Sequence, residues 1–163
     1  MIRLSIQFIL ALILLIFSTF ASWYEGSEIL DKPWEWKYST PFTKLFYEGN
    51  YNVSNISHLD YFVYAVKFKP TYPIIMLVSI LYLLIIIGYF YLKPRIKWLA
   101  YYQFILGGGF IILSYLVFQS PTLGGQTLYK IFILSAIFCI GASIITYLQI
   151  FNLIRMKLQI NHR

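Results

Sequence analysis

Four long apolar stretches dominate the pattern of hydrophobic and polar positions along the chain. A helix needs roughly 20 apolar residues to cross a hydrocarbon core about 30 Å thick. None of the four stretches contains an internal Asp, Glu, Lys or Arg. They predict an all-α membrane protein whose single domain, 1–163, is an antiparallel bundle of four transmembrane helices. The predicted spans are 4–22, 73–92, 98–118 and 131–154.

The charged residues between these stretches sort by side. Seven positive and no negative charges fall before the first span, between the second and third, and in a tail at 155–163. All six acids lie in the 23–72 loop. Because basic residues mark the cytoplasmic side, the pattern places both termini in the cytoplasm and the 23–72 loop outside.

Short connections complete this arrangement. Residues 93–97 predict a tight cytoplasmic hairpin, and residues 119–127, which contain Pro and two Gly, predict a short external turn. The first stretch also resembles a secretory signal peptide, because Arg3 precedes an apolar run that ends in small residues. Its length favours a retained anchor over a cleaved signal.

Composition narrows the class of protein. Of the 163 residues, 60% are hydrophobic and only 12% are charged, whereas a soluble domain has about 25% charged residues. The net charge of +7 is therefore an orientation signal, and no nucleic-acid partner is expected. With Cys139 as the only cysteine, a cysteine-pair redox centre and a thiolate metal cluster are excluded. We expect no cofactor and no metal.

The 23–72 loop is too rich in aromatic residues for a flexible linker. We expect it to fold as a small external cap on the membrane. Ser57 and Asp60 have the spacing of a capping box, with Asp in place of Glu, and predict a short helix over 59–68. One face of this helix would lie at the membrane interface, with lysines reaching from its end toward lipid head groups. The face consists of Leu59, Phe62, Val63 and Val66, and the lysines are Lys67 and Lys69.

A dense recognition-type motif lies near the start of this loop. Two tryptophans at positions i and i+2 of an extended segment would project the same way, and Trp and Tyr dominate binding hot spots. The motif therefore predicts a partner-binding site, although both rings could instead fold onto the interface or into the core of the cap. The motif residues are Trp34, Glu35, Trp36, Lys37 and Tyr38.

Loop acids offer a different interpretation. Glu25, Glu28 and Asp31 recur every three residues, so a continuing helix would bring them together, and His58 with Asp60 could complete a divalent-cation site or an interfacial enzyme site. Carboxylates near a surface are more often simply solvated or paired with lysines. No catalytic residue is assigned.

Small and hydroxyl-bearing residues gather near the middle of the last three spans. They predict either close helix packing or a midplane cavity that receives a tyrosine hydroxyl. The second possibility would suit an oligomeric channel, or a carrier for a neutral or lipidic substrate. The residues concerned are Tyr82, Gly107, Gly108, Gly109, Cys139, Gly141 and Ser143.

Three strings in the first half of the chain resemble a family of small, uncharacterised integral membrane proteins of Gram-positive bacteria. They are WYEGSE at 23–28, WEWKYS at 34–39 and YFVYAVKFKP at 61–70, so that the likeness is limited to about residues 1–92. The resemblance implies a bacterial cytoplasmic membrane and transfers no catalytic residue. We expect a non-enzymatic protein that binds a membrane or extracytoplasmic protein partner, or lipid, and that could form homo-oligomers or be an accessory subunit of a membrane complex.

Overall fold

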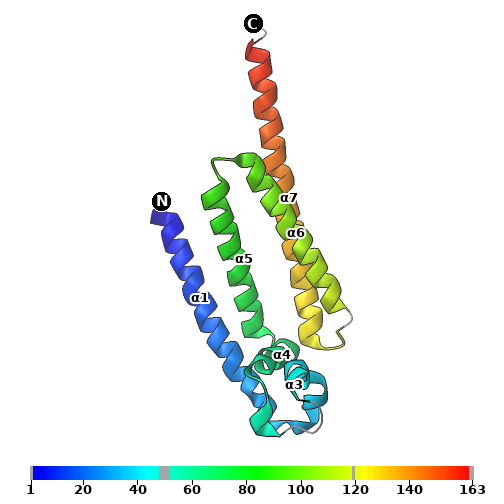
Figure 1. Cartoon of the computed structure of the whole chain (residues 1–163). Coiled ribbons are helices and arrows are strands. Elements are labelled where there is room, and N and C mark those ends of the chain that lie inside the picture. The colour runs from blue at the N-terminus through cyan, green and yellow to red at the C-terminus, as the bar shows by residue number, and fades with distance from the viewer. Residues whose placement is uncertain (1, 48–51, 119, 162–163) are drawn as a thin grey trace. The chain divides into compact units, whose positions relative to one another are not determined.

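The computed structural model describes residues 2–47, 52–118 and 120–161. Every regular element in these ranges is helical (Figure 1). Glu48, the first residue of the predicted turn at 119–127 and the last two of the predicted tail at 155–163 lie outside the described residues. The chain divides into two compact units, 1–83 with 120–128, and 84–119 with 129–163.

Four helices are long and apolar enough to cross a membrane, by length and composition. Their limits differ from the predicted spans mainly where polar residues continue a helix beyond its apolar stretch. The four are α1 (Ile2–Gly26), α5 (Thr71–Leu92), α6 (Ile96–Phe118) and α7 (Leu123–Asn161).

Helix α7 begins eight residues before the predicted span, so the predicted external turn is shorter than expected. The Thr122 hydroxyl accepts a hydrogen bond from the Gly125 amide at 3.2 Å, which caps the first turn of the helix. A Cβ at Gly124 would overlap the Val66 carbonyl oxygen and lie 2.7 Å from that of Lys67. Gly124, one of the two glycines that predicted a turn, instead allows the helix to start against the backbone of α4 (His58–Phe68).

Residues 27–70, here called the connecting segment, form a chain of short helices in the first unit. In chain order these are the 3₁₀ helices η1 (Ser27–Asp31) and η2 (Pro33–Glu35), the helices α2 (Trp36–Ser39) and α3 (Pro41–Phe46), the 3₁₀ helix η3 (Val53–Asn55) and the helix α4 (His58–Phe68). A small core of buried Ile29, Ile56, Tyr61 and Tyr64 holds them together, with Leu30 and Trp36 packed against it.

Helix α4 confirms the helix predicted over 59–68, and it lies across the end of α1 (Figure 1). The two helices approach closely at Gly26, where an added Cβ would overlap the Tyr61 carbonyl. Ser22 and Ser18, one and two turns earlier, are also fully buried. Small side chains on one face of α1 therefore set the distance at which α4 packs.

In the second unit, the end of α5 packs against α6 through an aromatic ring. A Cβ at Gly88 would lie 2.7 Å from the Tyr102 Cδ1 atom, and the Tyr102 hydroxyl donates to the Leu84 carbonyl at 3.0 Å. Helices α6 and α7 lie side by side (Figure 1), and the Ser143 hydroxyl of α7 donates to the Ala100 carbonyl of α6 at 2.8 Å. Both polar contacts satisfy hydroxyl groups inside apolar surroundings.

Candidate functional site

The 34–38 motif is helical, and the prediction of an extended segment is wrong. Pro33 starts η2, and α2 follows from Trp36 without a break. The cause is local, because Pro favours the first position of a helix and already has a helical φ. Positions two apart on a helix do not face the same way, so Trp34 and Trp36 do not form one two-ring surface.

The two tryptophans have different environments. The Trp36 indole Nε1 donates to the Ile29 carbonyl at 2.8 Å, and its ring packs against the small core. Trp34 is 70% exposed and Tyr38 is 67% exposed. Trp36 therefore belongs to the fold of the connecting segment, whereas Trp34 and Tyr38 remain accessible at its surface.

Asp60 is a structural residue of the connecting segment. Its fully buried carboxylate accepts hydrogen bonds from the Phe42 amide at 2.9 Å, the Thr43 amide at 2.8 Å and the Thr43 hydroxyl at 2.5 Å. It satisfies the free amides at the start of α3, where the positive end of the helix favours a carboxylate.

The predicted capping box of α4 forms only in part. The Ser57 hydroxyl accepts a bond from the Leu59 amide at 3.3 Å, as a capping residue does. The Ser57 amide donates to the Thr43 hydroxyl at 2.9 Å instead of to Asp60. Asp60 accepts hydrogen bonds from three donors of α3, whereas the capping box would give it only one, and the three bonds are more stabilising.

Helix α4 packs one of its faces against α1 and the small core. Asp60, Tyr61, Tyr64 and Ala65 are buried, whereas Leu59 is exposed. The two tyrosines and the short Ala side chain pack inward, and the stripe that includes Leu59 is not the one that α1 and the small core cover. Its placement at the membrane interface stays a prediction.

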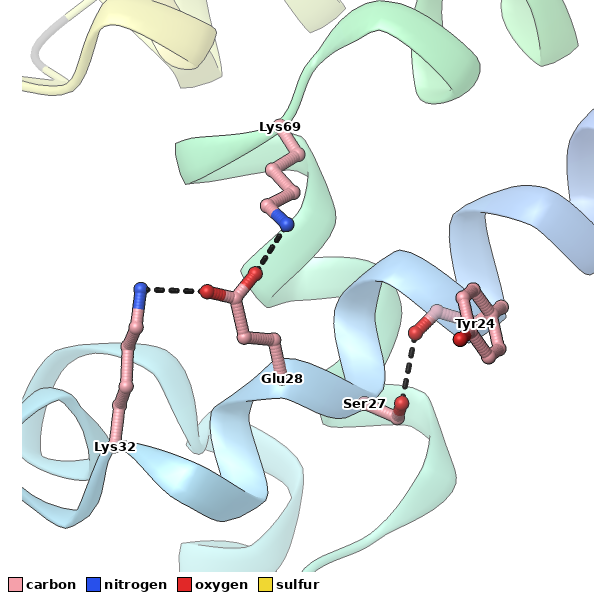
Figure 2. A network of polar contacts seen from close by, with 5 residues as sticks. All are labelled: Tyr24, Ser27, Glu28, Lys32 and Lys69. Atoms are coloured by element: carbon pink, nitrogen blue, oxygen red, sulfur yellow. Dashed lines mark hydrogen bonds and ion pairs between the residues drawn. The ribbon is translucent and has the colours of Figure 1, made fainter.

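Glu28 joins two parts of the connecting segment (Figure 2). One carboxylate oxygen lies 2.8 Å from the Lys32 ammonium, and the other pairs with the Lys69 ammonium just beyond the end of α4. The nearby Ser27 hydroxyl donates to the Tyr24 carbonyl at 2.7 Å (Figure 2). The hydrogen bond to Glu28 raises the pKa of Lys32, and a weaker interaction with Tyr64 raises it further.

Tyr64 lies at the centre of the segment with its ring 6.0 Å from the Lys32 ammonium. Burial raises the pKa of Tyr64, and hydrogen bonding to Glu35 raises it further. Glu35 of the predicted recognition motif is therefore turned toward the interior of the segment. The two charged residues of that motif have different environments. Lys37 is exposed and lies 5.8 Å from the centre of the Tyr38 ring.

The acids do not assemble into a metal site within the described ranges, where no three His, Cys, Asp or Glu residues could hold one ion. Asp60 caps α3 and Glu28 pairs with two lysines. Asp31 is exposed. His58 lies against aromatic rings, with ring centres 5.1 Å from Tyr61 and 5.9 Å from Trp23.

The small residues predicted near the membrane midplane fall into two units. Tyr82 belongs to the first unit and is 40% exposed, whereas the three glycines of α6 and the residues of α7 belong to the second. A Cβ at Gly107 would lie 2.6 Å from Ile140 Cγ1, so this glycine lies at a close approach of α6 and α7. A Cβ at Gly108, Gly109 or Gly141 would have nothing within 4 Å.

A cavity of about 20 Å³ lies in the second unit. Tyr102, Gln103 and buried Cys139 are among the residues that line it. This volume is close to that needed by one water molecule, and far below that of a site for an organic solute. Tyr102 was not predicted as a site residue, because an aromatic residue at the end of a span is typical of the membrane interface. The only feature of the sequence that pointed to it was Gly88 of the neighbouring helix α5.

These observations indicate the class of helical multi-pass membrane proteins: four helices are long and apolar enough to cross a membrane, and a folded segment lies between the first two along the chain. The chain belongs to the family described as Domain of unknown function (DUF4306), which matches residues 5–92. It is similar to the uncharacterized protein YjdJ of Bacillus subtilis (strain 168), with 33% identity over 84 residues that cover 50% of this chain and 76% of that protein. No solved structure matches the chain. The resemblance seen in the sequence is thereby confirmed.

Proposed function

We propose that the chain is a non-enzymatic protein of the bacterial cytoplasmic membrane whose connecting segment forms an external cap that docks a protein partner. The observation that carries the proposal is the exposure of Trp34 beside a core that is complete without it. A large aromatic ring that the fold does not need, and that remains in contact with water, is the type of side chain that anchors protein interfaces.

Neighbouring exposed side chains extend this argument. Tyr38 of α2, together with Leu45 and Phe46 of α3, is at least two-thirds exposed. The buried side of α3 is held by Asp60 through Thr43, so the exposed side is displayed by a fixed helix. A rigid display lowers the entropy cost of docking and supports partner recognition by this surface.

The proposed topology follows from charge and connection length. Seven positive charges without an acid flank the spans on one side, so both termini and the 93–97 hairpin face the cytoplasm. The connecting segment and the start of α7 then face outward, and the four long helices alternate in direction as an antiparallel bundle. A membrane-impermeant maleimide should label Ser54→Cys in intact cells and should label Lys97→Cys only after the membrane is broken. The opposite pattern would overturn the topology.

Docking is tested by placing a photoreactive amino acid at position 34 of the full-length protein in native membranes. The matched control carries the same group at Trp98, an exposed tryptophan on the predicted cytoplasmic side. We expect one defined crosslinked protein at position 34 and a different pattern at position 98. Truncation of a hot-spot tryptophan costs at least about 2 kcal/mol, so Trp34→Ala should weaken that complex roughly 30-fold. Identical patterns at both positions, or an unchanged complex in the variant, would refute the proposal.

A further inference from the structure

Three lysines lie around the end of the short helix α2. The Lys44 ammonium donates to the Lys37 carbonyl, and the Lys67 ammonium donates to the Tyr38 carbonyl. The Lys37 ammonium lies over the Tyr38 ring. Three lysines from α2, α3 and α4 thus surround the end of α2 in the first unit, and the charges of Lys44 and Lys67 are close enough to interact.

No carboxylate pairs with these three lysines in the part of the chain that the structure describes. The ion pairs found there join Glu28 to Lys32 and Lys69. Asp60, the acid closest in sequence to Lys67, is committed to the amides of α3. Burial lowers the pKa of Lys67, and the neighbouring charge of Lys44 lowers it further. Among the described residues, no carboxylate therefore balances the charge of this cluster.

The cluster also lies where two candidate membrane spans begin. Lys67 is in the last turn of α4, which ends at Phe68, and α5 begins at Thr71. Gly124, in the first turn of α7, packs against the Lys67 carbonyl. The first turn of a spanning helix lies at the depth of the lipid head groups, where lysine side chains meet phosphate.

We propose that Lys37, Lys44 and Lys67 form a binding site for the phosphate of an anionic phospholipid headgroup. An ammonium has three N–H donors, and the carbonyl contacts of Lys44 and Lys67 use one donor on each. The remaining donors can bind phosphate oxygens, and the anion balances the local charge. The site rests on the membrane placement proposed above, but it does not require the protein partner.

The experiment measures lipid binding to the purified full-length protein by native mass spectrometry, with phosphatidylglycerol and phosphatidylcholine as probes. We expect selective retention of phosphatidylglycerol. Each lysine near a membrane surface contributes a factor of about five, so Lys44→Gln with Lys67→Gln should weaken retention roughly 25-fold. Lys44→Arg with Lys67→Arg preserves the charge and should retain binding. Lys130→Gln, which removes one exposed lysine of α7 outside the cluster, is the matched control and should change little.

Each outcome bears on the proposal. Equal retention of the two lipids, an unchanged double Gln variant, or an equal loss in the Lys130 control would overturn it. Displacement of phosphatidylglycerol by millimolar inorganic phosphate would show that the site takes free phosphate and would overturn the lipid assignment. If the double variant does not fold, as judged by circular dichroism, Lys37→Gln gives the same test, because the Lys37 ammonium contacts only the Tyr38 ring among the described residues. Crosslinking at position 34 does not depend on this result, so the two proposals fail separately.

Discussion

The Thr43 hydroxyl donates a 2.5 Å hydrogen bond to the Asp60 carboxylate, joining helices α3 and α4 across 17 residues of sequence. Both side chains are fully buried. The same hydroxyl accepts the Ser57 amide, so it connects the start of α4 to the start of α3. This pair decides which surface of the connecting segment is fixed inward and which is displayed.

Replacing Asp60 should therefore destabilise the connecting segment. Asp60→Ala leaves two α3 amides and a hydroxyl without their acceptor, which costs about 3 kcal/mol or more. Hydrogen exchange of the Phe42 and Thr43 amides should become faster by at least 100-fold. Asp31→Ala, which removes an exposed acid, is the control and should change stability by no more than about 0.5 kcal/mol. Unchanged protection in Asp60→Ala would show that the network is dispensable.

Adding one methyl group should distinguish the glycines that pack from those that do not. Gly26→Ala forces a Cβ into the Tyr61 backbone and should lower the free energy of unfolding by roughly 1–3 kcal/mol. Gly108→Ala meets nothing within 4 Å and should leave stability unchanged, or raise it by up to about 1 kcal/mol through helix propensity. Thermal unfolding in detergent measures both. Equal effects of the two variants would contradict the packing of α1 against α4.

Breaking the Glu28 bridge should have a small, salt-dependent effect. Glu28→Gln removes the charge that pairs with Lys32 and Lys69. The partners are each about one-third exposed or more, so solvent screening limits the loss to roughly 0.5–1 kcal/mol. Unfolding should be followed at low and high ionic strength, and the difference from the unaltered protein should shrink as salt is added. A difference that salt does not alter would argue against an electrostatic role.

Alkaline pH should weaken the connecting segment through Tyr64. Its pKa in the folded chain lies above the ordinary value of 10.0 because burial, and then Glu35, disfavour the phenolate. As pH rises past 10.0, the unfolded chain loses this proton first, so stability is intact below that pH and falls above it. Tyr64→Phe should reduce this pH dependence, measured by chemical unfolding at pH values on either side of 10.0. An identical slope in the variant would remove Tyr64 as the cause.

Much of the architecture could be predicted because its causes are local in sequence. The uncharged apolar stretches identify the four long helices, and Ser57 marks the start of α4 within one residue. The start of α7 was misplaced because Gly124 and Gly125 are typical of turns. Only contact with the backbone of α4 explains why a helix needs a glycine there.

The candidate site was less predictable because side chains far apart in sequence compete for the same partners. Trp34 and Trp36 have the same chemistry, and the sequence offers no reason to separate them. Trp36 is fixed by the Ile29 carbonyl and the small core, and Trp34 is left exposed. Two lysines differ in the same way: Lys69 forms an ion pair with Glu28, whereas Lys67 donates to the Tyr38 carbonyl.

By itself, the sequence determined the four long apolar helices and the family of the chain, because hydrophobic length and short motifs are properties of neighbouring residues. The tertiary structure alone decided which polar groups are used inside the connecting segment and which remain available. Asp60 and Trp36 are held inside the connecting segment by hydrogen bonds, whereas Trp34 lies outside its core. Lys37, Lys44 and Lys67 have no carboxylate partner among the described residues. The physical reason is that a buried polar group must be satisfied by whatever the fold brings near it, and that neighbour is not encoded in local spacing.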